Sequence, residues 1–198
     1  MTGGPRIVVV GPSGAGKSTA ARRIAAALEI PHVELDAIFW GPEWTKRPMD
    51  ACRADLAAAT TGDAWIVDGN YREMRDVVWP RATMVVWLDV PWLRTMGQIL
   101  VRTFRRSATG QRVCGDNRET FGRALFSSDS VVHYAAVTLH RRRAEYHALL
   151  GFAGPEERSP LLPADVLIRV LRRPEHVERV IDELLDAKTD AARHTVVG

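Results

Sequence analysis

The sequence predicts an α/β fold in which helices cover both faces of a parallel sheet. Short apolar runs alternate along the chain with longer stretches of helical character. Most of these runs are continuously apolar, which is typical of strands that are buried on both faces. Several of them end at glycine or aspartate, where a strand gives way to a turn. A chain of 198 residues suffices for one well-buried domain, and we expect residues 1–198 to form it.

Five apolar runs account for the expected sheet, beginning with the β-branched run that ends at Gly11. The predicted strands are 6–10, 32–35, 64–67, 83–88 and 164–171. Five helical segments separate or follow them, and the second opens with Pro48. The predicted helices are 17–29, 48–60, 92–106, 119–150 and 174–188. Residues 107–118 contain two glycines and predict a long loop, and about 189–198 predict a flexible tail.

Composition favours a cytoplasmic location. No window approaches the length of apolar sequence that a membrane span needs, so we expect no membrane partner. The N-terminus lacks the layout of a secretion signal. The two cysteines, Cys52 and Cys114, lie far apart and form no metal-binding pair, which is typical of a reducing compartment.

Positive charge is concentrated in one segment. Residues 94–143 carry ten arginines and three acidic residues, and 24 of the 27 basic residues of the chain are arginine. Because arginine forms bidentate pairs with phosphate oxygens, this segment suits either a nucleotide polyphosphate or a nucleic-acid backbone. Solvated helix faces explain many of the same arginines equally well.

The stretch GPSGAGKST (residues 11–19) matches the phosphate-binding motif G-x-x-x-x-G-K-[ST], between an apolar run and a helical one. Glycines let backbone N–H groups approach phosphate oxygens, and the N-terminus of the following helix adds its positive dipole end. Lys17 is expected to reach the β- and γ-phosphates. The candidate nucleotide-binding residues are Gly11, Ser13, Gly14, Ala15, Gly16, Lys17, Ser18 and Thr19.

A magnesium ion is the expected companion of this loop. The Ser18 hydroxyl would ligate it, and Asp68, which closes the third predicted strand, would hold its waters. Asp89, at the end of the fourth strand, is the weaker alternative. A guanine-recognition motif is missing from the place where a signalling GTPase has one, since its only near match is AKTD at 187–190. The sequence therefore favours phosphoryl transfer over a GTP-driven switch.

Beyond this motif, the chain resembles the adenylate-kinase-related P-loop kinases over residues 6–185, and most closely the branch labelled DNA topology modulation proteins. The resemblance implies a P-loop three-layer sandwich with sheet order 2-3-1-4-5, a helical lid over about 102–127, and ATP as phosphoryl donor. The motifs that carry it are GPSGAGKST, Leu35-Asp36, WIVDGNYRE (65–73), WLDVPW (87–92), RTFRR (102–106), CGDNRET (114–120) and HRRRAEY (140–146).

The resemblance also implies site residues. The third strand of adenylate kinases ends D-G-F-P-R, and here residues 68–72 read DGNYR, so Arg72 is similar by position to the arginine that holds the transferred phosphoryl group. Lid arginines of the family clamp the donor phosphates, which implies this role for Arg102, Arg105 and Arg106. The pair Arg172–Arg173 lies where the adenine-contacting loop falls. This chain departs from the family at Tyr71, which replaces proline, and it lacks the cysteine set of a zinc-binding lid.

Asp36 is the candidate that would bind or deprotonate the acceptor hydroxyl, as acids do at this place in kinases of small hydroxyl compounds on this fold. Trp40 and Trp44 follow it and would either form a flat stacking wall for an acceptor or belong to the core.

Three functions remain open from the sequence. The favoured one is an ATP- and Mg²⁺-dependent kinase whose acceptor is a nucleotide or a small hydroxyl compound. The alternatives are a nucleotide-binding regulator with a basic DNA-contacting face and a slow NTPase. A nucleic-acid partner is thus the less favoured reading, and the sequence does not predict an oligomeric state.

Overall fold

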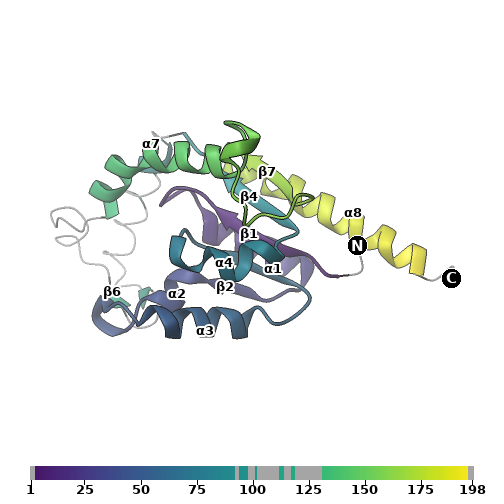
Figure 1. The fold of residues 1–198 in the computed structure, drawn as a ribbon, viewed down its shortest axis with the longest axis horizontal. Helices are drawn as coiled ribbons and strands as arrows, with labels where there is room; N and C mark the ends of the chain where they lie inside the picture. Colours follow the sequence, from purple (N-terminus) through teal and green to yellow (C-terminus); the bar gives the residue numbers. More distant parts are fainter. Residues whose placement is uncertain are drawn as a thin grey trace.

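The computed structural model describes residues 3–91, 94–97, 101, 112–113, 117–118 and 131–195. Its centre is a five-stranded sheet in which every strand pair is parallel, and Figure 1 shows it between helices. The strands lie in the order β2-β3-β1-β4-β7, which confirms the predicted α/β fold and the sheet order 2-3-1-4-5. Their bounds are Arg6–Val10 (β1), His32–Glu34 (β2), Trp65–Asp68 (β3), Met84–Leu88 (β4) and Leu167–Leu171 (β7).

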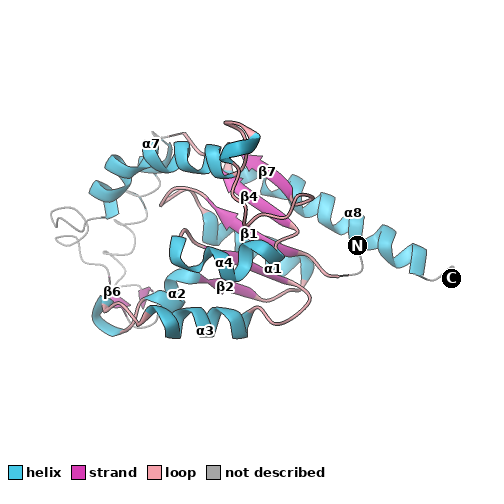
Figure 2. Cartoon of the chain, viewed as in Figure 1, coloured by secondary structure: helices cyan, strands magenta, loops and turns pink. Residues whose placement is uncertain are grey.

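Helices follow the strands and cover the sheet (Figure 2). The α-helices are Lys17–Leu28 (α1), Leu35–Phe39 (α2), Met49–Ala59 (α3), Arg75–Val78 (α4), Val131–Leu149 (α7) and Val177–Thr195 (α8). Short 3-10 turns are Pro42–Trp44 (η1), Arg72–Met74 (η2), Trp79–Arg81 (η3), Pro155–Glu157 (η4) and Pro174–His176 (η5). A separate antiparallel pair joins Arg112–Val113 (β5) to Asn117–Arg118 (β6).

Two hydrophobic clusters lie on opposite faces of the sheet. On one face, α1 packs through Ala20, Ile24 and Leu28, whose spacing of four places them on one side of the helix, and α8 packs beside them. On the other face, Trp79 after α4 and Tyr146 of α7 are buried among the side chains of β3 and β4. Alternate residues of β1, β3 and β4 point to the two clusters, so these three strands are apolar on both sides.

Some element boundaries differ from the sequence-based prediction. Leu35 ends the second strand early and begins α2, because its side chain is buried in the core rather than continuing the sheet edge. The segment 107–118, predicted as a loop, contains the strands β5 and β6. The helix α8 continues past Lys188 to Thr195. Most of the predicted helix 92–106 and of the lid at about 102–127 lies outside the described residues.

No helix in the described ranges combines the length and the apolar character that crossing a membrane requires.

Candidate functional site

The loop between β1 and α1 has the backbone of a phosphate cradle. Gly14 and Gly16 adopt positive φ angles of 80° and 93°, and α1 begins directly after Gly16. The N-cap residue is Gly16, so no N-cap side chain caps this N-terminus. Uncapped N–H groups and the helix dipole together attract an anion. The N–H of Ala15 donates to the Pro12 carbonyl at 3.2 Å, so this amide closes the turn of the loop.

Residue 11 has to be glycine because the backbone at the end of β4 approaches it closely. A Cβ atom there would lie 2.7 Å from the carbonyl oxygen of Leu88, and its φ of 148° is strained for any other residue. The Asn70 side chain holds the same glycine from the other side. Its Oδ1 accepts the Gly11 N–H at 3.3 Å, and its Nδ2 donates to the Gly11 carbonyl. The start of the loop is therefore held between β4 and the residues that follow β3.

Lys17 lies back over the loop. Its Nζ donates to the Pro12 carbonyl at 3.0 Å, which keeps the ammonium group beside the uncapped N-terminus of α1. Ser18 follows in the first helical turn and is partly exposed, while Thr19 is exposed. The Lys17 ammonium, the Ser18 hydroxyl and the main-chain N–H groups therefore lie in the loop and the first turn of α1, as the motif predicted.

Asp68 is a buried carboxylate at the carboxyl end of β3. It pairs in register with Val9, two residues before Gly11, and only 3% of its surface is exposed. Its Oδ1 lies 3.6 Å from Nε2 of His32, and its Oδ2 is buried without a hydrogen-bond partner among the described residues. A buried carboxylate oxygen needs a partner, and the waters of a magnesium ion would supply one. The chemistry of Ser18 and Asp68 therefore fits Mg²⁺.

Asp89, the weaker magnesium candidate, is engaged elsewhere. Arg143 of α7 holds both of its oxygens, with Nε at 2.6 Å from Oδ1 and Nη2 at 2.8 Å from Oδ2. A bidentate arginine neutralises this carboxylate and occupies the lone pairs that a cation would need. Within the described residues, no group of three or more His, Cys, Asp and Glu side chains is placed to hold a metal.

Asp36, the candidate that would bind the acceptor hydroxyl, lies at the start of α2, directly after β2. It is exposed in the first turn of α2, and its Oδ1 accepts a hydrogen bond from the Tyr71 hydroxyl at 2.7 Å. The ends of β2 and β3 meet here because Gly69 packs against Leu35, where an added Cβ would lie 2.6 Å from the Leu35 Cβ. The contact brings the two strand ends, and with them Asp36 and Tyr71, together.

Trp40 and Trp44 form neither a flat wall nor part of the fully buried core, the two alternatives that the sequence left open. The two rings lie 5.8 Å apart at 75°, and Trp40 also meets Phe39 edge-on, at 86°. The cause is a tight hairpin over residues 40–46, in which Gly41 N–H donates to the Thr45 carbonyl at 2.8 Å and Trp44 takes a left-handed φ of 60°. A backbone held in this conformation by the surrounding structure is a feature of binding sites. The result is an angular aromatic cluster that is only partly buried.

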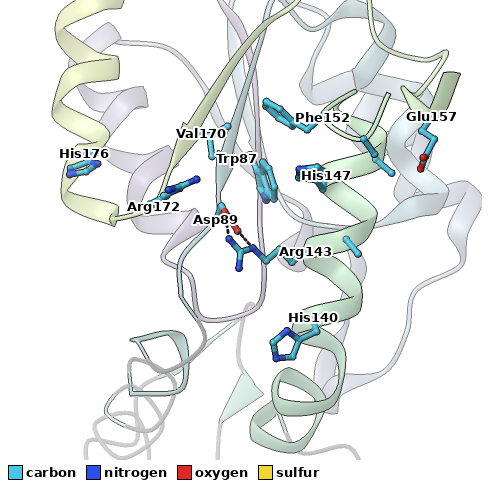
Figure 3. A pocket seen from close by; sticks show the side chains of 13 residues that line it. Trp87, Asp89, His140, Arg143, His147, Phe152, Glu157, Val170, Arg172 and His176 are labelled. Carbon is cyan, nitrogen blue, oxygen red and sulfur yellow. Dashed lines mark hydrogen bonds and ion pairs between the residues drawn. The ribbon is translucent and has the colours of Figure 1, made fainter. Parts of the chain in front are cut away.

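The predicted arginines are not gathered at one point. Arg72 is exposed in η2, directly after Tyr71, and its side chain forms no hydrogen bond or ion pair within the described part of the chain, although its carbonyl accepts the Arg75 N–H. Arg172 follows β7 and lines a cavity of about 860 Å³, together with Trp87, Arg143 and Phe152 (Figure 3). Arg102, Arg105 and Arg106 lie outside the described residues, so their roles stay predictions.

A buried network behind the phosphate loop was missed by the sequence analysis. Tyr146 of α7 is fully buried, and its hydroxyl donates to Asn70 Oδ1 at 2.9 Å. Arg75 donates to the same hydroxyl at 3.4 Å, pairs with Glu145 at 2.8 Å and lies 5.0 Å from the centre of the Trp79 ring. Burial raises the pKa of the Tyr146 phenol, so it remains a neutral donor at physiological pH. Helix α7 is thereby linked to Gly11.

Replacing Tyr146 by phenylalanine tests this link. The ring and its packing remain, but the hydrogen bond to Asn70 is lost. We expect the free energy of unfolding to fall by about 1 kcal/mol and the affinity for a Mg²⁺–ATP analogue to fall several-fold. Chemical denaturation and calorimetric titration measure the two effects. In an Asn70→Ala background the same change should have little further effect on binding, and fully additive losses would contradict the network.

No protein-family model and no curated protein matches the chain. A shikimate kinase from Bacteroides thetaiotaomicron matches in structure with a TM-score of 0.53 and 12% identity, over 93% of this chain and 98% of its own. A gluconokinase from Sinorhizobium meliloti 1021 has a TM-score of 0.48 and 17% identity, over 98% and 96%. A sugar kinase from Janibacter sp. HTCC2649 has a TM-score of 0.46 and 20% identity, over 92% and 95%.

The chain has a P-loop three-layer α/β fold. The shikimate kinase establishes this over nearly the full length of both chains, in agreement with the parallel sheet and the loop at Gly11–Lys17. At such low identity the similarity concerns the fold alone. No sequence-level match supports the narrower resemblance to the DNA topology modulation branch, which stays a prediction.

Proposed function

We propose that this protein is an ATP- and Mg²⁺-dependent kinase that transfers the γ-phosphoryl group of ATP to a nucleotide or a small hydroxyl-bearing acceptor. The observation that carries the proposal is the N-terminus of α1, which has no side-chain cap and has Lys17 beside it. The buried Asp68 lies close by in the sheet, at the end of β3, the strand that pairs with β1. An anion-binding turn and a buried carboxylate, one oxygen of which has no hydrogen-bond partner among the described residues, are the two parts that a Mg²⁺–nucleotide needs. The fold shared with a shikimate kinase supports the same function.

The residues of the loop have distinct roles in this proposal. Main-chain N–H groups between Gly11 and Thr19 bind the phosphates, and Lys17 stabilises the negative charge that develops during transfer. Ser18 and Asp68 would hold the magnesium ion, which when bound neutralises phosphate charge. Arg72 would bind the transferred γ-phosphoryl group, Arg102, Arg105 and Arg106 would clamp the donor phosphates, and Arg172 would contact the donor base.

Asp36 is the proposed general base. The acceptor hydroxyl oxygen forms a bond to the γ-phosphorus while the bond from that phosphorus to the β–γ bridging oxygen breaks, and ADP leaves. The hydroxyl proton passes to the Asp36 carboxylate, whose other hydrogen bond, from Tyr71, holds it in place. Because Asp36 is exposed, an acceptor can reach it from solvent.

The DNA-binding alternative loses support from the ion pairs of the arginine-rich segment. Arg94 pairs with Glu175, Arg142 with Glu145 and Arg143 with Asp89. A charge already paired with a carboxylate contributes less to phosphate-backbone binding, which depends on the release of counterions from phosphates. These described arginines therefore favour a structural role over a DNA-contacting face.

A two-part assay tests the proposal. We expect a non-hydrolysable ATP analogue with Mg²⁺ to raise the unfolding temperature, since a ligand at 100 times its Kd adds about 2.7 kcal/mol of stability. ADP release from ATP should then rise when hydroxyl acceptors are supplied. Release that is steady but indifferent to every acceptor would indicate a slow NTPase. The absence of any thermal shift would refute nucleotide binding.

A further inference from the structure

The acceptor side of the site has an unusual charge for a protein that binds phosphates. We define it as residues 34–76, from the end of β2 through α4, which includes Asp36, Tyr71 and Arg72. It contains nine acidic and five basic residues. This excess of acidic residues disfavours a phosphate monoester, which carries close to two negative charges at neutral pH.

Most arginines of this acceptor-side segment already form ion pairs with carboxylates of the protein. Arg47 donates to Asp55 at 2.7 Å and to the Ile38 carbonyl at 2.8 Å, which ties it across α2 and α3. Arg53 holds Asp76 through both guanidinium nitrogens, at 2.7 and 2.5 Å. The pKa of Asp76 lies below its ordinary value, chiefly because Arg53 donates these hydrogen bonds.

The third arginine, Arg75, is buried with 6% exposure and paired with Glu145. It thus faces the core network of Tyr146 and not an incoming ligand. Arg72 is left as the exposed arginine of the segment without a partner among the described residues, and the proposed transfer requires it for the γ-phosphoryl group. Within residues 34–76, all of which the structure describes, no arginine besides Arg72 is left to bind a second phosphate carried in by the acceptor.

The polar groups around Asp36 suit a different ligand. A carboxylate only accepts hydrogen bonds, so it binds hydroxyl donors well and binds a phosphate dianion, which has no donor, poorly. The neighbouring aromatic cluster has its rings tilted at 38° between Phe39 and Tyr71 and at 75° between Trp40 and Trp44. These rings do not form the parallel slot that a nucleobase stacks into, but their partly exposed surfaces can cover the C–H face of a small ring.

We infer that the acceptor is an uncharged, polyhydroxylated ring compound and not a nucleoside monophosphate or another phosphorylated molecule. This inference rests on the proposed kinase function and names the substrate class of its acceptor site. One ring hydroxyl would lie at Asp36, and the ring would lie against the aromatic cluster of Phe39, Trp40, Trp44 and Tyr71.

The experiment compares acceptor classes with the unaltered protein. ADP release from Mg²⁺–ATP is measured with neutral monosaccharides and cyclic polyols, with hexose monophosphates, and with nucleoside monophosphates. We expect kcat/KM for the best neutral compound to exceed that of every phosphorylated one by at least about ten-fold, because like charges at a binding site are strongly disfavoured. A nucleoside monophosphate that matches or exceeds the neutral compounds would overturn the inference and leave the kinase function intact. If no class promotes ADP release, the proposed function fails and this inference with it.

A variant with two fewer carboxylates tests whether the ion pairs of Arg47 and Arg53 are what excludes phosphorylated acceptors. The double variant Asp55→Asn and Asp76→Asn frees Arg47 and Arg53, and it should lower KM for phosphorylated acceptors several-fold while KM for the neutral acceptor changes little. The matched control is Glu178→Gln, which releases Arg23 on the opposite face of the sheet from the pair it forms there. An unchanged KM for phosphorylated compounds in a folded double variant would show that the ion pairs do not exclude them. Thermal unfolding verifies that both variants fold.

Discussion

Lys17→Ala is expected to reduce ADP formation from Mg²⁺–ATP by on the order of 10²–10³-fold. The Lys17 ammonium lies over the turn that precedes α1, where its charge would meet the γ-phosphoryl group as negative charge builds up on it. Alanine is a good helix former at the start of α1, so the free energy of unfolding should change by less than about 0.5 kcal/mol. A coupled assay of ADP release, with and without acceptor, measures the loss.

The chain offers a matched control for this variant. Lys188 is exposed in the C-terminal half of α8, and Lys188→Ala removes the same charge from a residue outside the loop and outside α1. It should leave ADP formation unchanged. Undiminished turnover in Lys17→Ala would show that the loop at residues 11–19 is not the nucleotide site. A loss of turnover accompanied by a large loss of stability would instead show that Lys17 supports the loop structure.

Asp36→Asn is expected to lower kcat by roughly 10²–10⁴-fold with little change in the affinity for ATP. Asparagine has nearly the same shape and can still accept the hydrogen bond from Tyr71, but it cannot take up the acceptor proton at neutral pH. ATP affinity should persist because Asp36 belongs to α2 on the acceptor side, away from the turn that binds phosphates. Steady-state kinetics and calorimetric titration of the ATP analogue separate the two quantities.

Tyr71→Phe distinguishes proton transfer from positioning at this site. It leaves the Asp36 carboxylate in place and removes only the 2.7 Å hydrogen bond that orients it. We expect a loss of several-fold in kcat, much smaller than for Asp36→Asn. A normal rate in Asp36→Asn would remove this carboxylate from the mechanism, whereas equal losses in both variants would indicate that Asp36 acts through Tyr71 as a structural pair.

The parts of the site that are formed by residues close together in the chain were predictable from the sequence. The loop at 11–19 works through the backbone of adjacent residues, so its glycines, Lys17 and Ser18 carry the signal locally. Asp68 and Asp36 were predicted because each follows an apolar strand, and the carboxyl ends of parallel strands meet at one edge of a sheet. The structure adds that Asp68 is buried and that one of its oxygens has no hydrogen-bond partner in the part of the chain that is described.

The contacts of α7 were not predictable in this way. Tyr146 is 76 residues from Asn70 in the chain, and Arg143 is 54 residues from Asp89. Neither residue belongs to a motif whose chemistry requires it, and helical periodicity does not say which strand a helix face meets. The interpretation of Asp89 as a weaker magnesium candidate lost its basis for this reason, because its arginine partner comes from a helix far along the chain.

The sequence alone determined the order of strands and helices, the phosphate loop and the carboxylates at strand ends, because each depends on neighbouring residues or on a repeating apolar pattern. Only the tertiary structure decided how the site is held and what it admits. Asn70 and Tyr146 fasten the loop, and carboxylates occupy Arg47, Arg53 and Arg75. These pairings depend on which surfaces pack together in the folded chain, and the order of residues along the chain does not reveal that.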